Sequence, residues 1–206
     1  MRRRFQIVLS VLGLTLFGAT SQAAAYDRYD HDHWDRDRTR IYGGLWLGFG
    51  GDIEIDGVGD VGDLGKTIGG QAGVDVLVSR YFSLGGEVRV GGFDIGNYDD
   101  RSRLIDLDFK PRLRLPIGRS PVELYATVPV GLTIPRLADI DGRGHDENIG
   151  WNVGIGGGVN VWVTHNFGLN VEPIWMLHKF GLDGTDGNGD VSVKQFAILL
   201  NAVFAI

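Results

Sequence analysis

Ten charged side chains stand at alternate positions in several stretches of this sequence, and they carry most of its potential chemistry. They are Asp75, Glu87, Arg89, Asp106, Asp108, Lys110, Arg112, Arg114, Glu123 and Glu172. Residues spaced by two lie on one face of an extended strand. Acids and bases on one face could conduct ions, or they could pair with one another and hold neighbouring strands together.

Hairpin geometry favours pairing of these charges. A short turn would place Glu123 opposite Arg114. A longer hairpin would place Glu87 near Lys110 and Arg112. Because an unpaired buried charge is strongly destabilising, we expect this charge cluster to be a structural core of ion pairs, with a charged gate as the alternative.

Histidines and an acidic loop are the other candidates for chemistry. Neither His178 nor His145 has a serine at a spacing that predicts a nucleophile and a base within about 3 Å of each other. We therefore expect no enzymatic activity. Residues 183–190 resemble the start of a Ca²⁺-binding loop, but Ala197 stands where the bidentate glutamate belongs. We expect a solvated turn there, with no metal site and no cofactor.

Composition restricts the class of protein. The chain has 206 residues, 33 of them glycine, and a formal net charge of −6. It has no cysteine, which excludes disulfides and thiolate metal ligands. The negative charge argues against a nucleic-acid partner. The length suits a single domain.

The N-terminus has the three parts of an export signal. Three arginines at residues 2–4 precede an apolar stretch at residues 7–17, and three alanines end at Ala25. Small side chains are what a signal peptidase requires at its cleavage site. The apolar stretch is shorter than the roughly 20 residues that a membrane helix needs. The sequence therefore predicts a signal peptide over residues 1–25, cleaved after Ala25.

Residues 26–40 alternate acids and bases and contain His31 and His33. Two histidines at this spacing could bind a divalent metal, but the segment is too polar to bury, and we expect a disordered periplasmic segment. No later stretch is long and apolar enough for a membrane helix. If the mature chain lies in a membrane, strands must cross it.

From residue 41 onwards, apolar residues alternate with polar or small ones. This pattern fills eight segments: residues 41–49, 71–78, 83–90, 105–115, 122–133, 151–163, 167–178 and 195–206. Their lengths are near the roughly 9–11 residues of a tilted membrane strand. The apolar face carries no charge, and the connections alternate between long and short, with residues 181–190 as a long loop. The sequence predicts an all-β fold, an eight-stranded antiparallel up-and-down transmembrane β-barrel over residues 41–206.

Three prolines fall inside these segments. Pro111, Pro129 and Pro173 cannot donate a hydrogen bond to a neighbouring strand, and a closed barrel offers no free edge. We expect bulges or local breaks in pairing at these positions.

The export signal, the eight alternating segments and the closing stretch 196–206 resemble the small OmpA/OmpX-type barrels of the outer membrane. The resemblance covers residues 41–206 and is one of architecture. Ile206 departs from it, since such barrels usually end in an aromatic residue. The resemblance implies a location in the cell outer membrane of a Gram-negative envelope. It also implies contact with outer-membrane lipid and lipopolysaccharide, and insertion by the barrel-assembly machinery.

Several functions remain open at this point. The sequence favours a barrel with a plugged polar lumen and a structural or surface-display role. Inward glycines at 154, 156 and 158 leave space and favour a small-solute or ion pore. A soluble periplasmic lipocalin-like carrier would use the same alternation with the apolar face inward. A lipid-modifying barrel enzyme is the remaining alternative.

Overall fold

The computed structural model describes residues 39–55, 59–63, 65–93, 102–118, 120–136, 146–184 and 187–206. Of these, only the backbone is described at 60–63, 146–147, 182–184 and 187–189. The expected signal peptide and most of the expected disordered segment lie outside these residues. Strand β1 begins at Thr39, two residues before the expected start of the barrel. Arg40 belongs to this strand because its buried side chain pairs with Glu123 in the interior.

The described chain forms strands throughout. They are β1 (Thr39–Ile55), β2 (Gly59–Asp63), β3 (Lys66–Ser79), β4 (Phe82–Phe93), β5 (Ser102–Pro116), β6 (Val122–Thr127), β7 (Val130–Arg136), β8 (Asp146–Glu147), β9 (Gly150–Trp162), β10 (Phe167–Gly184) and β11 (Gly187–Ala205). In this part of the chain, no helix is long and apolar enough to cross a membrane.

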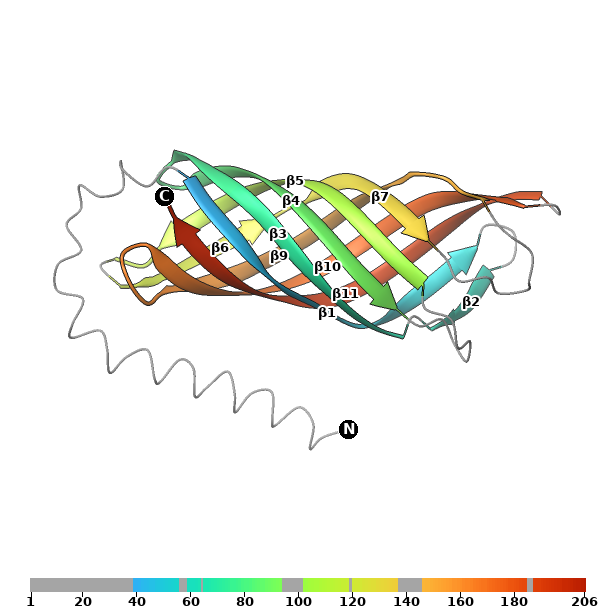
Figure 1. The fold of residues 1–206 in the computed structure, drawn as a ribbon, viewed down its shortest axis with the longest axis horizontal. Coiled ribbons are helices and arrows are strands. Elements are labelled where there is room, and N and C mark those ends of the chain that lie inside the picture. The colour runs from blue at the N-terminus through green and yellow to red at the C-terminus, as the bar shows by residue number, and fades with distance from the viewer. Residues whose placement is uncertain are drawn as a thin grey trace, which may run out of the picture.

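Antiparallel pairing closes the strands into a ring. β1 pairs with β3 on one side and with β11 on the other. β6 and β7 pair with the same two neighbours, β5 and β9, and together act as one strand of the wall. The ring β1-β3-β4-β5-β6/β7-β9-β10-β11 therefore has eight members, which is the expected fold (Figure 1). The short strands β2 and β8 extend the pairing at the ends of β1 and β10.

The prolines produce local breaks in the ladder without a change of register. Val128 and Pro129 separate β6 from β7, yet the pairing with β5 resumes beyond them in the same register. Val128 lies opposite Pro111, whose carbonyl accepts hydrogen bonds from the Val128 amide at 3.4 Å and the Thr127 hydroxyl at 2.9 Å. Pro173 stays paired with Ile198 on β11. Placing two prolines in one gap limits the number of lost ladder bonds.

The start of β1, the end of β11 and the tight turns gather at one end of the barrel. The amide of Ile206 donates to the carbonyl of Thr39 at 2.9 Å, so the last strand closes against the first. The tight turns β3–β4, β5–β6 and β9–β10 lie at this end, which we call the turn rim, and the longer connections lie at the opposite loop rim (Figure 1). Short turns face the periplasm in bacterial outer-membrane barrels.

One expected loop is a paired hairpin instead. β10 and β11 continue in register through Gly181–Asp190 to Gly184–Gly187, whereas the sequence predicted a long loop over residues 181–190. The hairpin projects beyond the rest of the loop rim (Figure 1). Backbone pairing continues there although the hydrophobic alternation has ended. Of the side chains that resembled a Ca²⁺ loop, only that of Asp190 is described, and it pairs with Lys179 at 3.2 Å.

The apolar face of the wall points outward. Leu124, Val128 and Val130 are 38%, 46% and 49% exposed, whereas Thr127 between them is 2% exposed. The lipocalin-like alternative required the opposite arrangement, so the orientation of these side chains overturns it. An exposed belt of this size is stable only against hydrocarbon.

The buried side chains of the interior form two layers of different character. Toward the loop rim it is apolar, with a buried cluster of Trp46, Ile53, Phe93, Leu104, Ile174, Met176, Phe180, Val191, Val193, Ala197 and Leu199. Toward the turn rim it is polar and charged. The sequence did not predict the apolar layer, because inward apolar residues interrupt the alternation that identified the strands.

Candidate functional site: the charged interior of the barrel

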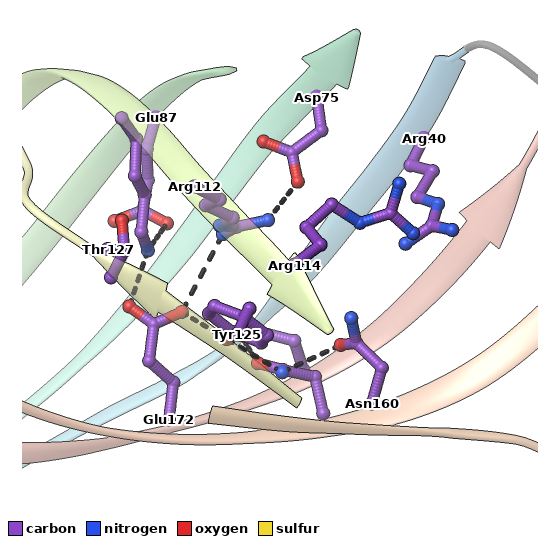
Figure 2. Close-up of polar contacts among 12 residues, drawn as sticks. Arg40, Asp75, Glu87, Arg112, Arg114, Tyr125, Thr127, Asn160 and Glu172 are labelled. Carbon is purple, nitrogen blue, oxygen red and sulfur yellow. Dashed lines mark hydrogen bonds and ion pairs between the residues drawn. The ribbon is translucent and has the colours of Figure 1, made fainter. Parts of the chain in front are cut away.

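All ten charged residues singled out in the sequence lie in the barrel interior. Each is at most 7% exposed, and they come from β3, β4, β5, β6 and β10. The strands place them there because their alternate positions share the face opposite the lipid belt. Figure 2 shows part of this cluster, with side chains that converge from several strands of the barrel.

The level nearest the turn rim centres on Glu123. Its carboxylate accepts two hydrogen bonds from the Arg114 guanidinium across the tight β5–β6 turn. Arg40 reaches it from β1 at 2.9 Å, and the Asn160 amide donates to it at 2.8 Å. The Arg40 guanidinium also stacks 4.6 Å from the ring centre of Trp162. One acid therefore joins four strands of the wall.

The middle level centres on Lys110. Its Nζ lies 2.8 Å from Glu87 Oε2 and 2.7 Å from Glu172 Oε1, and all three side chains are fully buried. The Tyr125 hydroxyl donates to Glu172 at 2.5 Å, and Asn170 donates to that hydroxyl at 2.8 Å. Every charged group at this level therefore has a charged or hydrogen-bonding partner.

Arg112 crosses the same level between two aromatic rings. It forms an ion pair with Asp75 and lies 3.6 Å from Glu172 (Figure 2). Its guanidinium carbon is 4.7 Å from the ring centre of Tyr42 and 5.0 Å from that of Tyr125. Cations within about 6 Å of an aromatic face are attracted by it. The sequence predicted that Glu87 lies near Lys110 or Arg112, and in the structure Glu87 forms an ion pair with Lys110.

The level nearest the apolar layer centres on Arg89. It forms an ion pair with Asp108 and lies 3.4 Å from Glu87 and 3.5 Å from Asp106. The guanidinium also lies 5.5 Å from the ring centre of Trp46. Arg89 thus links the charged layer to the apolar one.

His178 belongs to this level and not to an enzyme-like triad. Its Nε2 lies 3.1 Å from Asp106 Oδ2, and the Thr133 hydroxyl donates to the other oxygen of Asp106 at 2.5 Å. Its Nδ1 has no hydrogen-bond partner among the described residues. The described part of the chain also holds no group of three or more residues arranged to bind a metal ion.

Sequence reasoning missed several partners of the charges. Arg40 was assigned to a disordered segment, and Tyr125, Asn160 and Asn170 were not recognised as hydrogen-bond partners. The signal that could have found them is position, since Tyr125 is two residues from Glu123, and Asn170 is two residues from Glu172. Residues two apart share a face of the strand.

A closed antiparallel ring with an apolar belt outside and charges inside defines a class of protein, the outer-membrane β-barrels. The match to a family model agrees with this assignment. The chain belongs to the outer membrane protein beta-barrel domain family, whose model matches residues 9–204. Comparison with curated proteins gives no significant sequence match.

Two solved structures are similar to this chain in fold. OprG from Pseudomonas aeruginosa has a TM-score of 0.57 and 13% sequence identity, over 82% of this chain and 96% of OprG. Neisserial surface protein A (NspA) has a TM-score of 0.59 and 11% identity, over 82% of this chain and 97% of NspA. At these identities the likeness shows the fold alone.

Proposed function

We propose that this protein is a closed structural barrel of the outer membrane that displays its long connections at the cell surface. In this role the charged interior is a plug that ties the walls together and keeps the lumen shut to solutes. The expected partners are outer-membrane lipid, lipopolysaccharide and the assembly machinery that inserts such barrels.

The observation that carries the proposal is the set of ion pairs that cross the lumen. Arg40 and Glu123 join β1 to β6, and Lys110 and Glu172 join β5 to β10. A hydrogen bond between Asp106 and His178 also joins β5 to β10. None of these pairs lies between neighbouring strands of the ring. Charges that only hold a hairpin together would not need to reach the opposite wall.

The inward glycines do not support a pore. A Cβ atom at Gly158 would lie 2.5 Å from the Tyr125 hydroxyl oxygen, and one at Gly156 would lie 3.0 Å from the Ile174 side chain. A Cβ atom at Gly154 would collide with the Met176 sulfur. Each glycine makes room for a large side chain from another strand. These contacts support a closed barrel over a channel.

An enzymatic role has little support in the interior. Asp106 and His178 are fully buried, and the apolar layer separates them from the loop rim. A catalytic pair needs a nucleophile within hydrogen-bond reach and a path for the substrate. The described residues offer His178 Nδ1 no such nucleophile.

Cysteine labelling tests whether the lumen is closed. The chain has no cysteine, so Thr127→Cys introduces one thiol opposite Arg112 in the charged layer, and Arg80→Cys introduces one at the turn rim. In vesicles, a water-soluble maleimide should label Cys at 80 quickly and leave Cys at 127 unlabelled until the barrel is unfolded. Rapid labelling at 127 in the folded barrel would favour the pore.

A further inference from the structure

Two arginines face each other on the outer surface of the barrel. Arg103 on β5 and Arg136 on β7 are directly opposite in the ladder, and both are exposed. Their neighbours Ser102, Leu104 and Pro135 are buried in the interior, so the two arginines point outward. Like charges directly opposite on adjacent strands destabilise a sheet. The pair therefore calls for a counter-charge.

The pair lies at the edge of the lipid belt. The next outward pair along the same strands is Ile105 and Ile134. Outward positions of β5 are then apolar as far as Leu115, which matches the roughly 9–11 residues of a tilted membrane strand. Arg103 and Arg136 thus occupy the first outward position beyond the hydrocarbon at the loop rim. This is the level of the lipid headgroups.

An aromatic residue lies on the same outer face. Trp151 on β9 lies opposite Leu132 on β7 and is 46% exposed. Leu132 is four residues from Arg136 along β7, so the arginines lie further toward the loop rim than Trp151 does. Aromatic side chains concentrate toward the interfaces of outer-membrane barrels.

The protein itself supplies no counter-charge to this pair within the described residues. Elsewhere at the loop rim, outward-facing lysines form ion pairs with acidic residues. Lys194 lies 2.7 Å from Glu54, and Lys179 lies 3.2 Å from Asp190. Arg103 and Arg136 form no such pair with any described side chain. On its other side Arg103 is paired with Gly92, which has no side chain to supply a charge.

We propose that Arg103 and Arg136 together bind a phosphate group of an outer-leaflet lipid headgroup. The loop rim faces the outer leaflet because the short turns face the periplasm. Two guanidinium groups present forked donors that match phosphate oxygens. The bound phosphate neutralises the repulsion between them, and the lipid's acyl chains lie against the apolar belt below.

Thermal unfolding in detergent micelles tests the site. Diphosphoryl lipid A is added to the folded barrel in a neutral detergent, and the midpoint of unfolding is followed by heat-modifiable mobility. A ligand that binds only the folded state raises this midpoint. Binding should weaken about 30-fold in Arg103→Gln/Arg136→Gln, because each basic residue near an anionic surface contributes about fivefold. The control Lys194→Gln removes one positive charge from the same rim and should keep wild-type binding.

Control measurements with other ligands identify the group that is bound. Dephosphorylated lipid A and inorganic phosphate should leave the midpoint of the wild type unchanged. Without added lipid, the double Gln variant should fold and be at least as stable as the wild type, since the repulsion is gone. Equal protection by free phosphate or by the dephosphorylated lipid would overturn the proposal. Undiminished binding of lipid A by the double variant, or no binding by the wild type, would overturn it as well.

Should the double Gln variant fail to fold, Arg103→Lys/Arg136→Lys is the second test. It keeps both positive charges but removes the forked pair of N–H donors that each guanidinium presents. Its affinity for diphosphoryl lipid A should be lower than that of the wild type and should fall as salt is added. Affinity equal to the wild type and independent of salt would contradict recognition of the phosphate.

Discussion

Lys110 Nζ lies 2.7 Å from Glu172 Oε1, although the two residues stand on strands that do not touch in the ring. Two members of the ring, β6/β7 and β9, lie between β5 and β10. Both side chains are fully buried. The pair therefore ties opposite walls of the barrel through its interior.

Replacing Lys110 with alanine should destabilise the barrel. Glu87 and Glu172 would then be buried without their shared cation, and breaking a buried ion pair costs about 3–5 kcal/mol. Urea unfolding in lipid vesicles, followed by tryptophan fluorescence, measures this loss. Adding Glu172→Gln to Lys110→Ala should recover part of the stability, since one uncompensated charge disappears. If the single and double variants were equally stable, the pair would not be coupled.

A charge at the middle of the lipid belt should impair insertion. Val128 is 46% exposed and lies opposite Pro111, near the centre of the apolar run on β5. Val128→Arg should cost about 2–4 kcal/mol, whereas Ile117→Arg at the turn rim should cost about 0–1 kcal/mol. The fraction of folded barrel on a heat-modifiable gel reports both. A larger loss for Ile117→Arg would place the belt elsewhere on the wall.

Gly158 should tolerate no side chain. A Cβ there would lie 2.6 Å from Tyr125 Cζ, and Tyr125 holds Glu172 through its hydroxyl. We expect Gly158→Ala to cost about 1–3 kcal/mol through overpacking. The outward Gly86 has its nearest neighbour at 3.9 Å, so Gly86→Ala is the matched control and should be nearly neutral. Equal stability of the two variants would mean that Tyr125 does not fill this space.

The strands could be predicted because lipid imposes a strict pattern. Every second residue of a membrane strand must be apolar, and this requirement makes all eight wall strands visible in the sequence. This alternation cannot identify strands that extend beyond the hydrocarbon. β10 and β11 continue as a paired hairpin beyond the hydrocarbon. Neither face of this hairpin meets lipid, so residues 181–190 lack the alternation and were predicted to be a loop.

The interior was harder to predict than the wall. Arg114 and Glu123 belong to one tight hairpin, so sequence distance alone could suggest their contact. Lys110 and Glu172 meet only because the ring closes and its strands are staggered, and no local pattern encodes that. Inward apolar residues such as Trp46 and Met176 looked like irregularities, although they form the buried apolar layer.

Electrical conductance across a planar bilayer tests the central claim most directly. The folded wild-type barrel, its insertion verified by heat-modifiable mobility, should give no steady current above that of the bare membrane. In the proposed closed barrel, the cross-lumen pairs and the apolar layer block the path of ions. A steady open-channel current from the unmutated protein, with an ion selectivity that changes in Arg112→Ala, would contradict the closed barrel and leave the fold intact.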